Sequence, residues 1–162
     1  MSDPFAVDLK PHFVDAPMLR IAGTRAHYTA ADKQGMADQW RQFAPRMDTI
    51  AQRVGRVGWG VVANMSGDGV DYVAGVEVAT IAGLPADLVQ LSIPAQRYAA
   101  FAHRLEAARI GEAMHAIFQL WLPRSGLRHA RGGPADLLER YGEAFDPQTG
   151  TGDIELWLPI AQ

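Results

Sequence analysis

The chain has no cysteine among its 162 residues, and this absence removes several classes of site. Disulfide frameworks, thiolate nucleophiles and thiolate-bound zinc all require cysteine. The histidines do not compensate, because no two of them have metal-ligand spacing on one expected element; they are His12, His27, His103, His115 and His129. We therefore expect no metal and no other cofactor.

Basic charge and long apolar runs are also scarce. The chain carries 15 Lys and Arg against 18 Asp and Glu, which gives a net charge of -3, and its pI is about 5.9. A nucleic-acid surface needs a clustered positive face. No apolar run approaches the ~20 residues of a membrane span, and the opening MSDPFAVDLK does not resemble a signal peptide. We expect a cytoplasmic protein that binds neither nucleic acid nor membrane.

What is present is a hydrophobic content of 48%, enough for one domain over 1–162 with a sizeable core. Its periodicities predict both strands and helices. The expected strands cover 18–29, 57–63, 71–78, 97–104 and 153–160, and the expected helices cover 35–53 and 108–122. The segment 79–96 is expected to be a connector that crosses the fold and packs. Pro45 should kink or break the first helix, and Pro123 should end the second.

Similar residues recur in the two halves of the sequence, at a spacing of about half the chain length. Trp40 and Trp121 lie 81 residues apart, and Val76-Glu77-Val78 resembles Ile154-Glu155-Leu156 at an offset of 78. Such spacing predicts two copies of a strand-helix-strand-strand unit, over about 17–80 and 95–160. The expected fold is therefore α+β with an antiparallel sheet.

The segment 136–141, DLLERY, fits two structures. Pro134 would suit the first turn of a helix, and local propensity favours a helix. The repeat needs a strand at this point, and we predict a strand. On a strand, Glu139 and Tyr141 would share a face with Leu137.

The last expected strand presents a similar pair, because Glu155 and Trp157 alternate with aliphatic residues. If helices cover the aliphatic face, the opposite face of the sheet would carry Glu139, Tyr141, Glu155 and Trp157 together. The sequence therefore predicts one face with two acids and two aromatic rings.

Several stretches in this order resemble the GyrI-like small-molecule-binding family, which also forms the effector-binding domain of AraC-type and MerR-type multidrug regulators. The stretches are AGTRAHY, QWRQF, DYVAGVEV, LSIPAQRYAAFAH, IFQLWLPRSGL, LLERYGEAFDP and DIELWLPI. The resemblance implies a tandem pair of modules with a ligand groove between them. It also implies that Glu139, followed by Tyr141 in the family's E-x-Y motif, is the acid of that groove. The matching module starts by about residue 18, so we expect no DNA-reading domain ahead of it, and the chain resembles the standalone form.

The remaining candidates are weighed against commoner roles. Most acids face solvent and most aromatic residues pack in cores, whereas Trp and Tyr faces can also hold a planar cation. The candidate ligand-binding residues are Glu139, Tyr141, Trp59, Trp157, Glu155, Phe101, Tyr98 and His103. Trp40 and Trp121 are interpreted as core.

Three functions stay open at this point. The first is binding of an aromatic small molecule, cations included, with Glu139 as the charge. The second, by resemblance to hydrolases of cyclopropane-containing electrophiles, is a cofactor-independent enzyme with Glu139 and Tyr141 as catalytic residues. The third is docking on a protein partner such as a topoisomerase. Both small-molecule functions use the same carboxylate, so the sequence does not separate them.

Overall fold

A computed structural model of the chain describes residues 9–29, 33–104, 106–131 and 133–161. The strands are β1 His12–Ala16, β2 Leu19–Tyr28, β3 Arg53–Ser66, β4 Gly69–Val78, β5 Val89–Ile93, β6 Gln96–His103, β7 Arg128–His129, β8 Leu137–Tyr141 and β9 Ile154–Ala161. The helical segments are α1 Lys33–Met47, the 3-10 turn η1 Ala107–Arg109, α2 Ile110–Ala116, the π-helical turn η2 Ile117–Trp121 and α3 Leu122–Ser125.

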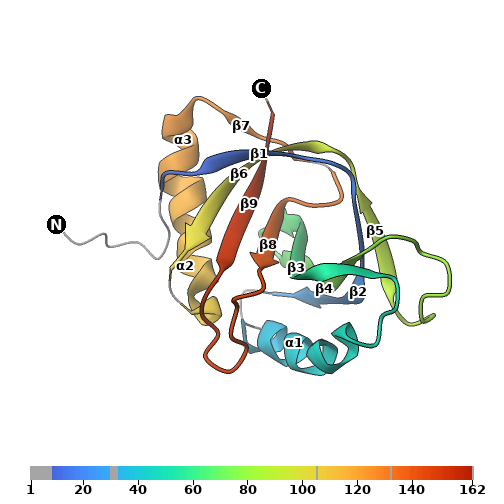
Figure 1. Cartoon of the computed structure of the whole chain (residues 1–162). Coiled ribbons are helices and arrows are strands. Elements are labelled where there is room, and N and C mark those ends of the chain that lie inside the picture. The colour runs from blue at the N-terminus through green and yellow to red at the C-terminus, as the bar shows by residue number, and fades with distance from the viewer. Residues whose placement is uncertain (1–8, 30–32, 105, 132, 162) are drawn as a thin grey trace.

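The strands form one antiparallel sheet in the order β1-β6-β9-β8-β3-β4-β2-β5, and the short β7 pairs with β9. The sheet curls strongly, and the two helical segments lie outside the curl, with α1 along the bottom and α2 and α3 at the left of Figure 1. The fold is therefore α+β with a curled nine-stranded antiparallel sheet among the described residues. Strands β3 and β8 occupy its centre.

Each face of the sheet buries its own apolar cluster, because successive side chains of a strand point to opposite faces. The outer face packs against the helices through residues such as Phe43, Val76 and Ile117. The inner face lies within the curl and gathers residues such as Ile21, Trp59 and Tyr98. The sheet is thus buried on both faces, and a side chain on one face is separated from the other by the backbone.

Two strands depart from the expected pattern. Strand β1 pairs with β6, and β5 pairs with residues 19–23 of β2. Neither strand was expected: the segment 79–96 was predicted only as a packed connector, and β5 lies within it. Each of these strands has five residues, which is too short for its alternation to stand out from an apolar connector.

The segment 136–141 was the ambiguous one, and the prediction of a strand is confirmed for Leu137–Tyr141. Its backbone is paired on both sides, with β3 and with β9. Pairing on both sides outweighs the local helix propensity, which amounts to a few tenths of a kcal/mol per residue. The other expected strands and helices are present with altered ends.

The helix ends differ for identifiable reasons. Helix α1 ends at Met47 rather than at 53, two residues after Pro45, which cannot donate an intrahelical hydrogen bond. Pro123 does not end the second helical run, which continues to Ser125. The π-helical turn η2 resets the hydrogen-bond register just before it, and proline is tolerated at the start of a helical segment. Among the described residues, the helices are all too short or too polar to cross a membrane.

Candidate functional site

Glu139 lies in the middle of the outer face of the sheet. The strand registers place it in a row of residues that crosses six strands from β6 to β2: Phe101, Leu156, Glu139, Gly60, Ala74 and Thr24. Helix α1 packs on β2 and β4 at one end of this row, and Trp121 of η2 packs on Phe101 at the other end. The carboxylate therefore sits between the two helical segments.

Two tyrosine hydroxyls hold the carboxylate. Tyr72 Oη donates to Glu139 Oε1 at 2.5 Å, and Tyr141 Oη donates to the same oxygen at 2.8 Å. The indole Nε1–H of Trp40 donates to Tyr72 Oη at 2.7 Å. Both tyrosines and Glu139 are buried, with Glu139 only 4% exposed. A chain of hydrogen bonds thus links helix α1 to the central acid.

A glycine makes room for this acid. Gly60 pairs with Glu139 across β3 and β8. A Cβ atom at Gly60 would lie 2.6 Å from Glu139 Oε1 and would also collide with Tyr72 Oη. The missing side chain therefore lets the carboxylate and the tyrosine hydroxyl meet above the sheet.

Burial controls the protonation of all three groups. Loss of water raises the pKa of Glu139, and the hydrogen bonds from Tyr72 and Tyr141 oppose that rise. Burial, and next the charge of Glu139, raise the pKa of both tyrosines well above the ordinary value. The tyrosines therefore stay protonated and remain hydrogen-bond donors.

Aromatic rings cover the carboxylate. The Trp40 and Tyr141 ring centroids are 5.3 Å apart, and those of Tyr141 and Phe145 are 4.8 Å apart. Trp40 and Phe145 are half-buried and so lie at the outer side of this layer. These aromatic side chains pack beside the buried acid through Tyr141, whose hydroxyl bonds to it.

Half of the sequence-predicted residues lie on this outer face. Beside Glu139 and Tyr141, they are Phe101 and His103 of β6. Phe101 contacts the ring of Trp121 with centroids 4.9 Å apart. The ring Nε2 of His103 lies 2.9 Å from the carbonyl oxygen of Glu106, which directs this histidine to the start of η1.

The other half lie within the curl, on the opposite face: Trp59, Trp157, Tyr98 and Glu155. The indole of Trp157 contacts Trp59 at 5.1 Å and Tyr98 at 5.3 Å between ring centroids. Glu155 forms an ion pair with Arg140 at 3.5 Å, and His12 Nε2 lies 3.7 Å from its carboxylate. These rings are core, and Glu155 belongs to a charged cluster.

The prediction that two acids and two aromatic rings share one face is therefore wrong, and the register is the reason. Glu139 pairs with Leu156, so it shares a face with the aliphatic residues of β9, while Trp157 pairs with Leu138. A shift by one residue would have put Glu139 beside Trp157. The helices cover the same face that carries Glu139.

Sequence reasoning missed three members of the site. Trp40 was interpreted as core, Gly60 was interpreted as a strand residue, and Tyr72 was not singled out. Tyr72 could have been singled out from the sequence, because it is the one aromatic residue in the alternating strand DYVAGVEV. Its contact with Glu139 spans 67 positions and depends on the sheet order β8-β3-β4.

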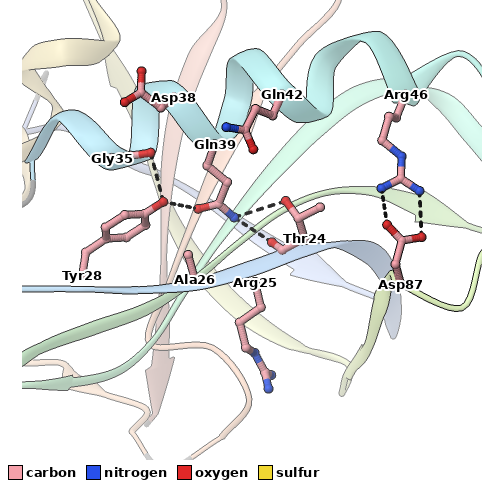
Figure 2. A pocket seen from close by; sticks show the side chains of 10 residues that line it. All are labelled: Thr24, Arg25, Ala26, Tyr28, Gly35, Asp38, Gln39, Gln42, Arg46 and Asp87. Atoms are coloured by element: carbon pink, nitrogen blue, oxygen red, sulfur yellow. Dashed lines mark hydrogen bonds and ion pairs between the residues drawn. The ribbon is translucent and has the colours of Figure 1, made fainter.

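An open cleft of about 530 Å³ lies on the far side of α1, between this helix and residues 24–28 of β2. Figure 2 shows its inner wall, where Gln39 bridges the helix and the strand. The amide Nε2–H of Gln39 donates to Thr24 O at 2.7 Å, and Tyr28 Oη donates to Gln39 Oε1 at 2.6 Å. A smaller hollow of about 290 Å³ is lined by Leu9, Leu120, Trp121 and Arg124. Neither hollow is lined by Glu139.

Replacing Gln39 with leucine should destabilise the protein by about 1–3 kcal/mol, because Thr24 O loses a buried donor. The exposed Gln42, one turn further along α1, lines the same cleft and provides the matched control, Gln42→Leu. Urea unfolding of both variants measures the difference. Equal stability would mean that Gln39 does not fix α1 on β2.

The described residues hold no cluster of three or more His, Asp or Glu side chains that could bind a metal ion. The arrangement at Glu139 is instead one acid, two phenol donors and a layer of aromatic rings. Pockets with many apolar groups and few placed polar ones are typical of small-molecule-binding domains. The fold and the site thus define an α+β domain with a buried acid beneath aromatic side chains.

The comparisons with known proteins identify the family. Residues 9–161 match the GyrI-like small molecule binding domain, and the chain belongs to this family. It is 28% identical over 155 residues to the transcriptional regulator BrlR of Pseudomonas aeruginosa, a match that covers 94% of this chain and 56% of BrlR. The chain therefore spans about half the length of this curated relative.

Solved structures agree on the fold. The structure of SAV2435 bound to tetraphenylphosphonium superposes with a TM-score of 0.68 at 15% identity and covers 94% of both chains. The C-terminal domain of EcmrR gives a TM-score of 0.67 at 12% identity and covers 94% of this chain and 98% of that one. At these identities the likeness shows the fold.

Proposed function

We propose that this protein binds aromatic cations at the outer face of the sheet, with Glu139 as the counter-ion. The observation that carries the proposal is a single acid, buried among aromatic rings and bonded by neutral phenols. A buried carboxylate without a cationic partner favours a ligand that supplies the positive charge. Tetraphenylphosphonium, bound by the structurally similar SAV2435, has this chemistry.

Aromatic side chains can serve both as cover and as ligand contacts. Trp40, Tyr141 and Phe145 form the layer above the acid, and a cation that displaces the outer rings would contact the faces of those that stay. Each cation–π contact contributes about 0.5–2 kcal/mol. Entry then requires Trp40 and Phe145 to move while Tyr72 and Tyr141 keep the carboxylate oriented.

We also infer that the two halves of the chain are copies of one unit related by a pseudo-twofold axis. The order β6-β9-β8 of the second half mirrors the order β3-β4-β2 of the first. The axis would pass near the pair formed by Gly60 and Glu139. An acid in one copy and a glycine in the other gives one carboxylate at the centre, where two would repel each other.

Hydrolysis of a strained electrophile is the second candidate. It is favoured by the raised pKa of Glu139, which suits a general base, and by the adjacent Tyr141 hydroxyl, which could position water. Product analysis separates the two functions. A cyclopropane-bearing alkylating compound that gains one water catalytically, with wild type alone, would identify a hydrolase.

Binding is tested with tetraphenylphosphonium and its uncharged analogue triphenylphosphine oxide, by tryptophan quenching and calorimetry at pH 8. We expect the cation to bind with 1:1 stoichiometry and at least about 10-fold more tightly than the oxide. Equal binding would exclude charge recognition, and no binding of either compound would contradict the proposal.

A further inference from the structure

We propose that Glu139 carries a proton on Oε2 when no ligand is bound and that an aromatic cation takes the place of this proton, so that binding releases one proton. The inference rests on the proposed function and adds that ligand binding is linked to the protonation of Glu139. The exchange is balanced: a neutral carboxyl and a cation become an ion pair and a free proton. Ligand charge and solution pH would then control the same site.

The two carboxyl oxygens differ in their surroundings. Oε1 accepts both tyrosine hydroxyls, at 2.5 and 2.8 Å. No hydrogen bond from any described residue reaches Oε2, and no ion pair between described residues includes Glu139. Oε1 is thus fixed by the protein, and Oε2 is the oxygen that can accept a proton or face a cation.

A negative charge at this place would lack compensation. Glu139 is 4% exposed, so water contributes little to its solvation. Two neutral phenol donors stabilise a carboxylate, but burial outweighs them and raises the pKa of Glu139. Protonation is the usual response of a buried acid that has no cationic partner.

Among the described side chains, no cation lies against Glu139. Strand β4 contributes Tyr72, β8 contributes Tyr141, and the outer-face positions of β3 and β9 near the acid are glycine and aliphatic residues. Two histidines of the sheet lie on this face, His103 of β6 and His129 of β7. Ile154 of β9 lies between His103 and Tyr141 in the strand register, and His103 Nε2 lies against Glu106 O. His129 pairs with Ile160, its ring contacts Phe118, and its Nε2 lies 2.7 Å from Asp136 O.

Several charged groups of the neighbouring helical segments are engaged in ion pairs at the surface. On α1, Arg41 pairs with Asp38 at 2.8 Å, and Arg46 pairs with Asp87. On the other side, Arg109 and Glu112 pair at 2.7 Å, and Arg140 pairs with Asp153 and Glu155 on the inner face. The cation that balances an ionised Glu139 therefore comes from the ligand.

The rule has opposite consequences for two ligand classes. A cation without an exchangeable proton, such as tetraphenylphosphonium, would bind the ionised form and gain affinity as pH rises. A neutral aromatic acceptor, such as triphenylphosphine oxide, would accept a hydrogen bond from the protonated form and lose affinity as pH rises. Glu139 would thus select charged ligands at high pH and uncharged acceptors at low pH.

Calorimetric titration with tetraphenylphosphonium tests the exchange between pH 5 and 9, at each pH in two buffers that both have capacity there. Because the two buffers differ in ionisation enthalpy, the difference in observed heat counts the protons released. We expect close to one proton at low pH, declining to none at high pH, with affinity rising by up to 10-fold per pH unit and then levelling. Binding without proton release at any pH would overturn the exchange and leave the proposed function standing. No binding at any pH would overturn both.

Two variants identify the group that loses the proton. Glu139→Gln should show no proton release with any ligand that it still binds. His103→Gln should retain the release, and its disappearance in this variant would assign the proton to His103 and overturn the inference.

The ligand-free protein offers a measurement that needs no ligand. Because the folded state raises the pKa of Glu139, the folded state binds more protons than the unfolded state between the two pKa values. The contribution of Glu139 to stability is therefore complete at low pH and is lost as pH rises through the folded-state pKa. Urea unfolding across this range should show wild type losing stability relative to Glu139→Gln, and parallel profiles would contradict a proton on Oε2.

Discussion

Replacing Glu139 with glutamine should weaken the binding of tetraphenylphosphonium by about 100-fold at pH 8. Removing one partner of a buried ion pair costs roughly 3–5 kcal/mol of binding free energy. The glutamine amide, which still offers a polar oxygen to the cation, recovers part of that cost. Glutamine keeps the size of the side chain and an oxygen that can accept from Tyr72 and Tyr141. The variant therefore removes charge while it preserves the packing. Calorimetry or tryptophan quenching gives the two dissociation constants.

Two further acids make this comparison specific. Glu143 is exposed and follows β8 in the next loop, so Glu143→Gln controls for the loss of one negative charge. Its affinity should stay within about twofold of wild type. Glu155 lies on the inner face, where Trp157 Nε1 donates to it at 3.3 Å. If Glu155→Gln loses binding and Glu139→Gln keeps it, the ligand lies within the curl and the proposed site is wrong.

The sequence predicted most strands and both helical regions because their periodicities are long. Alternation over DYVAGVEV and DIELWLPI identifies β4 and β9 directly. It fails for β1 and β5, which have five residues each and gain their order from pairing with β6 and with β2, far away in the sequence. Such pairing is non-local and leaves little local signal.

The site was predicted in part for a related reason. The resemblance to a family singled out Glu139 and Tyr141, and the structure brings these two together at 2.8 Å. The aromatic partners were predicted from strand faces, which requires the register between strands. Register depends on the packing of the whole sheet, so Trp59 and Trp157 were assigned to the wrong face and Tyr72 was missed.

Gly60→Ala should be the most disruptive single-methyl change at the site. The added Cβ would lie 2.6 Å from Glu139 Oε1 and would overlap Tyr72 Oη, and both of these residues are buried. Overpacking of this kind costs about 1–3 kcal/mol. Because the carboxylate must also move, we expect tetraphenylphosphonium binding to fall by at least about 10-fold, measured on the folded fraction. Urea unfolding and calorimetry provide the two readouts.

The matched control is Gly67→Ala in the exposed turn between β3 and β4, where an added Cβ meets no atom within 4 Å. It removes the same backbone freedom without a collision, so its stability should stay within about 0.5 kcal/mol of wild type.

A second variant tests whether the collision with Tyr72 causes the loss of stability in Gly60→Ala. If the collision with the phenol is the cause, Tyr72→Phe should restore part of the stability lost in Gly60→Ala, which gives a favourable coupling in the double-mutant cycle. If the two changes are additive, or if Gly60→Ala is as stable as Gly67→Ala, then Gly60 does not make the space in which Tyr72 and Glu139 meet.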